Sequence, residues 1–500
     1  MSDISEQAIL HNDYNIRLNQ QMLPPDGQHV TLHCLRFAEA FKLEDYEKLK
    51  TGLDRLYDES DRPDGYWATE DRENYKEFLS LSKRAFLPGG WLNLSGFVSR
   101  SFAESNKKAP IMACVRELPQ GVSSLRFCLF RMMPSMIVLV ARIDPDEYIS
   151  NSLNEIMLEQ FEERSEKHST GIRHISVTIV KGERIDTWIG NQQYASEAFI
   201  AKYFSGEFLS RDEKDIQCKC PSIKLYSLQD IPFTPATKLT DWLDVYKHFV
   251  QLIGEPFITY QFDNQYLMFE HSRFQKGDRP TDIRILTSES LFKAPEAHQM
   301  YGSIIGAIRY GHENAFDNFL ALLAIDQVLR ARIKLAIKHR NKLDEYCIDS
   351  NNSLDSKREQ YSNIYNAKKV VSGDYYDFLR FRQELEYITS AEAEPWLYRE
   401  APSFELLDNQ HKRPDFVRGL VSNMRHLVSL LDGSFALLNT RYSDLFESVS
   451  SLSNFAVADS AYQYQKQLSI LTWVLIILTA FVVALTAIMA VPVIIRFLAQ

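Results

Sequence analysis

A long apolar segment close to the C-terminal end constrains this chain more than any other feature. No charged residue occurs between Leu468 and Ile495. A helix of this length spans about 42 Å at 1.5 Å per residue, whereas the hydrocarbon core of a bilayer is about 30 Å thick. Trp473 and Arg496 lie near its ends, where aromatic and basic side chains meet lipid headgroups. The segment predicts one transmembrane helix, residues 468–496, that crosses once with a tilt.

The charges beside this segment do not decide its orientation, because Lys466 precedes it and Arg496 follows it. The N-terminal sequence has no basic region followed by an apolar one, as a secretory signal peptide has. We therefore expect a single-pass protein of the cell membrane with its N-terminal body in the cytoplasm.

The composition of the body is that of a folded globular protein, with 45% hydrophobic and 24% charged residues in a chain of 500. This length predicts more than one domain. The net charge of −10 argues against a nucleic acid polymer as partner, because such binding depends on many basic contacts to phosphate. The six cysteines are scattered without the paired spacing of a zinc site, which favours reduced thiols.

The fold class that the hydrophobic pattern predicts is an α/β cytoplasmic domain (1–290), a helical domain (291–414), a stalk helix (415–467) and the transmembrane helix. The expected strands are Trp91–Val98, Ile111–Arg116, Leu125–Arg131, Met136–Ile143, Ile172–Val180, Ser222–Tyr226, Phe257–Phe262, Tyr266–Glu270 and Ile283–Leu286. The expected helices are Thr31–Ser60, Glu70–Arg84, one from Asp144 or Asp146 to about Glu166, Tyr194–Phe204, Tyr310–Leu343, Leu354–Val371, Tyr375–Ile388, and the chain from Asp415 onward with a break at Asp432–Gly433.

A heptad seam precedes the apolar segment, with alternating steps of four and three residues. Its members are Leu431, Phe435, Leu438, Tyr442, Leu445, Val449, Leu452 and Ala456. Such a seam needs a partner, and two remain open: the same helix from other subunits in a coiled-coil stalk, or neighbouring helices of the same chain.

Threonines recur inside the apolar segment at a spacing of seven, at Thr472, Thr479 and Thr486, and Gln465 continues the same helix face. In an oligomer these residues are pore-facing candidates, because stacked hydroxyl rings hydrate ions weakly. The alternative is that each threonine bonds a carbonyl of its own helix without any pore.

A basic cluster marks the long helix expected at Tyr310–Leu343, and we take its members as candidates for binding an anionic ligand such as a nucleotide or a lipid headgroup. The candidates are Arg330, Arg332, Lys334, Lys338 and Arg340, with His339 and Lys342 beside them. The alternative is that they complement the helix dipole and face solvent.

We find no catalytic motif in this sequence, which contains no GxGxxG, Walker A, HExxH or GxSxG pattern. His29 and His33 fall at a spacing of four beside Cys34, but no spaced partner completes a metal site. We therefore expect that the protein is not an enzyme.

The layout of the chain resembles the CorA-like magnesium transporter superfamily. The match is closest at the junction Tyr464-Gln-Lys-Gln-Leu-Ser-Ile-Leu-Thr-Trp-Val-Leu, and in the paired segments Leu125-Arg-Phe-Cys-Leu-Phe and Ile137-Val-Leu-Val. The family has two membrane helices joined by a loop with a Gly-Met-Asn signature, and that signature does not occur in this sequence. The resemblance implies a homo-oligomer, by analogy a pentamer, whose first helix lines the pore and whose cytoplasmic domain senses a signal. By the same analogy, acidic residues between subunits could bind regulatory Mg²⁺.

These observations lead us to expect an oligomeric membrane protein whose cytoplasmic domain senses a signal and controls cation permeation or a membrane leak. Two alternatives belong to other classes. One is a ligand-activated membrane effector, for example in antiviral defence, that acts without specific ion transport. The other is a tail-anchored enzyme.

Overall fold

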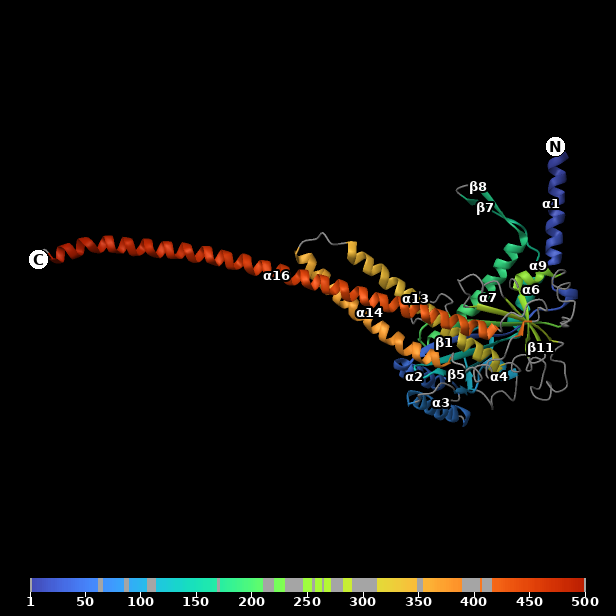
Figure 1. Ribbon diagram of the computed structural model, residues 1–500. Helices are drawn as coiled ribbons and strands as arrows, with labels where there is room; N and C mark the ends of the chain where they lie inside the picture. The colour runs from blue at the N-terminus through green and yellow to red at the C-terminus, as the bar shows by residue number, and fades with distance from the viewer. Residues whose placement is uncertain are drawn as a thin grey trace. The chain divides into compact units, whose positions relative to one another are not determined.

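The computed structural model divides the chain into two units (Figure 1). The α/β unit comprises Met1–Ala331 and Arg380–Ser429, and the helical unit comprises Arg332–Leu379 and Leu430–Gln500. The structure describes residues 2–61, 66–84, 90–105, 114–168, 171–209, 220–229, 246–253, 257–262, 265–270, 282–289, 313–348, 354–388, 405–406 and 416–498.

One mixed sheet of eleven strands forms the centre of the α/β unit, in the order β13-β10-β11-β12-β9-β1-β6-β5-β3-β4, with β2 paired to β5. Its parallel pairs are β9 with β12 and β3 with β4. The strands are β1 Thr31–Lys42, β2 Trp91–Asn93, β3 Phe97–Ser99, β4 Cys114–Arg116, β5 Val122–Met133, β6 Met136–Pro145, β9 Ser222–Leu228, β10 Phe257–Phe262, β11 Gln265–Glu270, β12 Asp282–Ser288 and β13 Glu405–Leu406. A separate hairpin pairs β7 Arg164–His168 with β8 Gly171–Ile175.

The described helices differ widely in length, and the three longest lie in the C-terminal part of the sequence. They are α1 Ser2–Gln21, α2 Tyr46–Asp58, α3 Tyr66–Arg84, α4 Arg100–Ser105, α6 Glu147–Leu158, α7 Val177–Ala201, α9 Lys247–Ile253, α13 Glu313–Ile348, α14 Leu354–Ile388 and α16 Phe416–Leu498. The α/β region followed by helices and an apolar C-terminal helix agrees with the predicted fold class.

The expected strands near residues 125–131, 136–143, 222–226 and 283–286 are confirmed, as is the hairpin of β10 and β11. The single strand expected at Trp91–Val98 is instead two short strands, β2 and β3. The described part of Ile111–Arg116 is β4, and its first three residues lie outside the described chain. The helix expected after residue 144 also forms. Asp146 caps it, because its carboxylate accepts the backbone N–H of Ile149 at 3.1 Å, but the helix ends at Leu158.

Four further expectations on secondary structure are wrong. The first half of Thr31–Ser60 is the strand β1, and only residues from Tyr46 onward are helical. The strand expected at Ile172–Val180 ends at Ile175, where α7 follows. The two helices expected between residues 354 and 388 are one helix, α14, and α16 continues through Asp432–Gly433 without a break.

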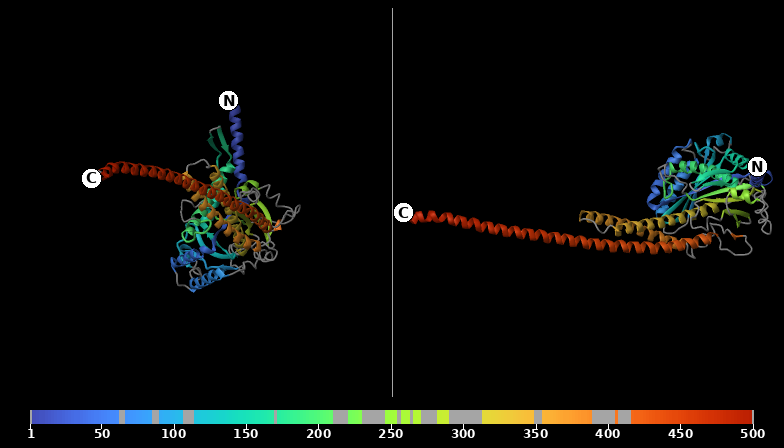
Figure 2. Two further views of the ribbon diagram at one scale, coloured as in Figure 1. Left: turned by 60° about the vertical axis from the view of Figure 1, so that its left-hand side comes forward. Right: turned by 90° about the horizontal axis from the view of Figure 1, so that it is seen from above.

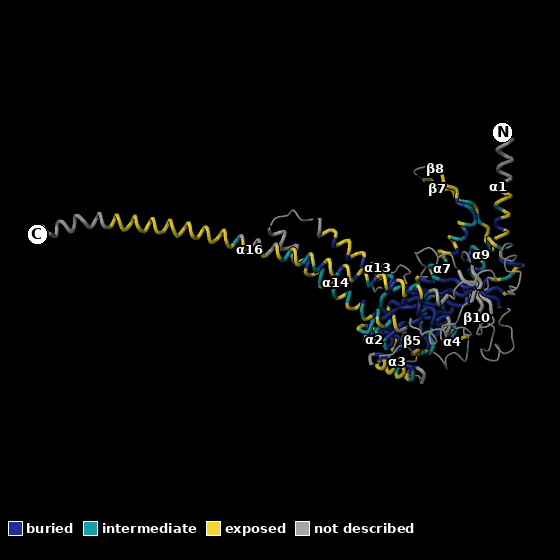
Figure 3. The backbone as a smooth tube through the Cα atoms, viewed as in Figure 1, coloured by how far each residue is buried: buried dark blue, intermediate teal, exposed yellow. Residues whose placement is uncertain are grey.

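The main hydrophobic core lies on one face of the sheet. Leu35, Phe37 and Phe41 of β1 belong to one cluster with residues of β5 and β6, and this cluster includes apolar side chains from α2, α3, α6 and α7. Figure 3 shows the strands as mostly buried, and Figure 2 shows the unit from two further directions. Each fully buried leucine side chain contributes about 1.5–3 kcal/mol, and the strand period of two places Leu35, Phe37 and Phe41 on the same face of β1.

Glu39 is the one acidic residue of β1, and it is buried on the core face. Its carboxylate accepts the backbone N–H groups of Ala40, Phe208 and Leu209 at 3.0, 2.9 and 2.6 Å, which ties the chain after α7 to the sheet. Gly206 lies so close that an added Cβ would stand 2.6 Å from a Glu39 oxygen. Burial raises the pKa of Glu39 to about 8, against the three N–H donors, which lower it.

This pKa predicts that the protein loses stability as the pH rises from about 4.5 to 8. In that window the unfolded chain has released the Glu39 proton and the folded chain still holds it, so the free energy of unfolding falls with pH, by up to about 5 kcal/mol. Denaturant unfolding at pH 5 and pH 8 measures the difference, which should shrink in Glu39→Gln. The exposed Glu44→Gln is the control. An unchanged pH dependence in Glu39→Gln would contradict the prediction.

In the helical unit, described by itself, the first part of the heptad seam is buried within the chain. Leu431, Phe435, Leu438 and Tyr442 are at most 5% exposed. Phe435 stacks on Phe378 of α14 with ring centroids 5.4 Å apart, and the Tyr442 hydroxyl donates to the His339 carbonyl of α13 at 2.9 Å. Neighbouring helices of the same chain therefore cover these seam positions. Whether residues 415–467 also serve as an oligomeric stalk stays a prediction.

Candidate functional site

The described part of α16 contains one segment that is long and apolar enough to cross a membrane, Ser460–Thr486, with a mean hydropathy of 2.7. None of this segment is buried inside the chain. Large apolar side chains such as Leu471 and Ile477 are 62% and 64% exposed (Figure 3). A helix of a soluble core would bury such side chains, whereas a lipid bilayer solvates them. The segment is therefore the candidate membrane site of the protein.

The three threonines of this segment each donate a hydrogen bond to their own helix. The hydroxyls of Thr472, Thr479 and Thr486 reach the carbonyl oxygens four residues earlier at 2.8, 2.7 and 2.7 Å. Gln465 is exposed about two helical turns before the first of them. These bonds satisfy the hydroxyls without a pore. That the threonine face lines a cation path stays a prediction.

The members of the basic cluster lie along the single helix α13, across the boundary between the two units. Arg330 belongs to the α/β unit and donates to Asp326 of its own helix at 2.8 Å. Arg332, Lys334, Lys338 and Arg340 belong to the helical unit, where the last three are exposed. The neighbouring His339 is buried and lies 2.8 Å from the Asp374 carboxylate of α14. Anion binding by these residues stays a prediction.

A groove of about 730 Å³ lies in the α/β unit between the end of α2, the strand β4 and the helix α7. Its volume is within the range of small-molecule sites in proteins. Its lining residues are Glu59, Asp61, Arg100, Arg116, Glu117, Leu118, Pro119, Tyr194, Ala195, Ala198, Phe199, Lys202 and Tyr203.

Arg116 lies at the base of this groove and is only 7% exposed. Its guanidinium donates to the Glu59 carboxylate at 2.6 Å, to the Leu56 carbonyl at 2.7 Å and to the Tyr203 hydroxyl. It also stacks on the Tyr203 ring at 4.7 Å from the centroid. Burial lowers the pKa of Arg116 below its ordinary value, and Glu59 acts in the opposite direction. The groove thus offers aromatic surface and fixed charges, which suits a flat, partly polar ligand.

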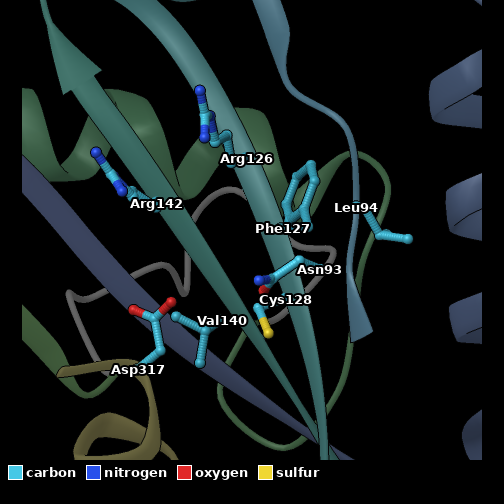
Figure 4. Close-up of a pocket in the computed structure, with 8 residues that line it drawn as sticks. All are labelled: Asn93, Leu94, Arg126, Phe127, Cys128, Val140, Arg142 and Asp317. Carbon is cyan, nitrogen blue, oxygen red and sulfur yellow. The ribbon is translucent and has the colours of Figure 1, made fainter. Parts of the chain in front are cut away.

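A second cavity, of about 70 Å³, lies on the sheet face opposite the main core (Figure 4). It is lined by Asn93, Leu94, Arg126, Phe127, Cys128, Val140, Arg142 and Asp317. Figure 4 shows Arg126 and Arg142 rising from adjacent strands on the same side of the sheet, with Asp317 reaching toward it from α13.

Arg126 and Arg142 are part of a row of three arginines. In the ladder Arg36 of β1 pairs with Arg142 of β6, which pairs with Arg126 of β5. Asp317 accepts a hydrogen bond from Arg36, and Asp144 accepts the Nε and Nη2 groups of Arg142 at 3.1 and 3.2 Å. We call Arg36, Arg142 and Arg126 the arginine row.

The sequence did not identify the arginine row or the groove as sites. One signal was present, because Arg126 and Arg142 each interrupt an apolar run that predicts a buried strand. A charged residue at such a position needs a buried partner or a ligand. For Arg36 the signal is hidden, because the hydrophobic spacing of its segment predicts a helix.

No group of three or more His, Cys, Asp and Glu side chains with the geometry of a metal site occurs among the residues that the structure describes. His33 lies on β1 with its Nε2 2.6 Å from the Ser227 hydroxyl, and His29 is exposed. Mg²⁺ therefore stays an implication of the family resemblance alone.

Comparison with known proteins adds no assignment, since neither a scan against protein-family models nor a search of curated proteins gives a match for this chain.

Proposed function

We propose that this protein is a ligand-responsive membrane protein, in which the α/β unit receives a signal and the C-terminal helix acts in the bilayer to control cation permeation or a leak. The observation that carries the proposal is the exposed apolar segment Ser460–Thr486, none of which is buried in the chain. An uncovered surface of this kind is found in soluble proteins only at interaction sites, and its length matches a bilayer.

The groove beside Arg116 supports a receiving role for the α/β unit. It has the size of a ligand site, and its lining charges are balanced, with Arg100, Arg116 and Lys202 against Glu59, Asp61 and Glu117. A balanced, aromatic-lined groove favours a ligand that stacks and bonds locally over a bare ion.

Assembly of several copies of α16 would be needed for a path through the membrane, because a single helix encloses no channel. The family resemblance supports a homo-oligomer, and the threonine face would then point toward its axis. The helix carries no charge between Leu468 and Thr486, so such a path would be lined by hydroxyls and apolar side chains.

The second candidate is a membrane effector that disrupts the bilayer without ion selectivity. It is favoured by the threonine hydroxyls, which bond to their own helix and offer an ion few free oxygens. In both cases the protein would be attached to the membrane with the α/β unit on one side.

Flux from liposomes tests the proposal and separates its two forms. The full-length protein is reconstituted into vesicles loaded with Mg²⁺ and a small uncharged dye, and a Mg²⁺-sensitive dye outside the vesicles reports released Mg²⁺. Release of Mg²⁺ alone, once a deproteinised cell extract is added, is the expected result for a controlled cation path. Release of both Mg²⁺ and the uncharged dye would indicate the effector, and release of neither would contradict the proposal.

The same assay tests whether the groove is the receiving site. Ala198→Trp would fill the groove without touching the Arg116–Glu59 pair, and should abolish the response to the extract. Asn191→Trp is the matched control, since Asn191 is an exposed residue of α7 outside the groove lining. An intact response in Ala198→Trp would remove the groove from the mechanism.

A further inference from the structure

We infer that copies of this chain associate side by side through one exposed face of α16, which runs from the soluble part of this helix into the membrane segment. This face, which we call the outer line, consists of positions spaced seven residues apart. It begins with Leu430, Leu437, Asp444, Ser451, Ala458 and Gln465 and ends with the three threonines of the membrane segment. The inference rests on the proposed membrane location of α16, because that location aligns the copies.

The outer line is distinct from the heptad seam, which neighbouring helices of the same chain already cover. The seam residues Leu431 and Leu438 follow directly after Leu430 and Leu437 and are only 1% and 5% exposed. Successive residues of a helix point about 100° apart, so the two sets of leucines face different directions. Contact with another copy of the chain therefore needs a face other than the seam.

The outer line is uncovered in the soluble part of α16. Leu430 and Leu437 are 51% and 53% exposed, and Asp444 and Ser451 are exposed as well. A single exposed leucine is ordinary on a protein surface. These two leucines, however, repeat at the spacing of seven residues at which the side chains of one helix enter the facing helix of a coiled coil. The outer line therefore indicates a helical partner.

The same line continues into the membrane segment. Counting by sevens from Leu437 leads to Gln465 and then to Thr472, Thr479 and Thr486, all of them exposed. A straight α-helix turns such a line by about 20° per heptad, so the line keeps facing one partner only when the helices form a left-handed supercoil. A partner that follows the whole line must itself be a helix that passes into the bilayer.

A second copy of this chain meets these requirements. Copies that cross one bilayer with the same segment stand parallel and at the same height, so that equal positions of the outer line meet. The Asp444 carboxylates of two copies would repel each other at this contact. Arg441 lies one turn earlier and is also exposed, so the Arg441 side chain of one copy can pair with Asp444 of the next and offset the repulsion.

Disulfide crosslinking of the full-length protein in cell membranes tests the inference. Leu437→Cys should give a covalent dimer on mild oxidation, because a disulfide forms where the Cα atoms of two cysteines lie about 4.4–6.8 Å apart. Ala436→Cys is the matched control, since Ala436 is exposed on the same helix but points about 100° away from Leu437. This control should give no more dimer than the unchanged protein, which shows the background from the native cysteines.

A second pair of variants tests the membrane end of the outer line. Gln465→Cys should also give the covalent dimer, and Tyr464→Cys, at a neighbouring residue that is 69% exposed, should not. Crosslinking needs no ligand and no leak, so its result is independent of the flux assay. A dimer from a protein that releases no Mg²⁺ would support the association and contradict the proposed function. Equal dimer in Leu437→Cys and Ala436→Cys, no dimer in either, or crosslinking of Leu437→Cys to a different protein would overturn the inference.

Discussion

Replacing Ile477 and Phe481 together with arginine should release this protein from membranes. Both side chains are 64% exposed on α16 and lie one helical turn apart inside the apolar segment. An arginine near the middle of a membrane helix costs about 2.5–3.5 kcal/mol in insertion experiments, so two should cost about 5–7 kcal/mol. The fraction of protein that stays in the membrane pellet after carbonate extraction measures the effect.

The matched control places the same charges at the start of this segment, before the uncharged run that begins at Leu468. Tyr462 and Tyr464 are 64% and 69% exposed, nearly as much as the tested pair, and precede Leu468. Arginines at these positions can reach the headgroups, so Tyr462→Arg with Tyr464→Arg should leave the protein in the pellet. Retention of the Ile477/Phe481 variant in the pellet, or carbonate extraction of the unchanged protein, would show that the segment does not cross the bilayer.

Removing the carboxylate of Asp317 should strongly destabilise the α/β unit. Arg36 is fully buried, and Asp317 is 2% exposed and accepts its hydrogen bond. Loss of one partner of a buried ion pair typically costs about 3–5 kcal/mol, because the other charge stays in a poorly solvated place. Denaturant unfolding of Asp317→Ala in detergent, followed by tryptophan fluorescence, measures this loss.

Two further variants separate the cost of an unpaired charge from the loss of the pair itself. Arg36→Met with Asp317→Leu removes both charges and should recover a large part of the stability. Glu386→Ala breaks a surface pair with Arg382, 2.7 Å apart in the same unit, and should cost at most about 1 kcal/mol. If Asp317→Ala were as mild as Glu386→Ala, the Arg36–Asp317 pair would not stabilise the fold.

The strand β1 shows how a local pattern can mislead. His33, Arg36 and Glu39 recur every three residues among apolar neighbours, which is typical of the polar side of a helix. In the structure Arg36 and Glu39 point to opposite faces of a strand covered on both sides, and each has its own buried partners. The spacing of three between Arg36 and Glu39 reflects two separate buried interactions on opposite faces of the strand. The partners, Asp317 and Leu209, lie far away in the sequence, so the local pattern does not reveal them.

The helix α14 shows a second case in which a local signal misleads. The sequence Ser372-Gly373-Asp374 predicted a break, but the Ser372 hydroxyl bonds Asn439 at 2.9 Å and Asp374 pairs with His339. These contacts within the helical unit stabilise the helix across the glycine, whose local penalty is only about 1 kcal/mol. Tertiary contacts thus outweigh local propensity.

The sequence by itself determined the features that depend on neighbouring residues. The apolar segment after Leu468, the strands β5 and β6 and the succession of an α/β region by helices follow from hydrophobicity and its period. Only the tertiary structure brings together the residues of the groove and of the arginine row. Arg36 and Asp317 lie 281 positions apart, and strand register, which short-range pattern does not encode, places Arg36 beside Arg142. A site built from distant residues exists only once the sheet has formed.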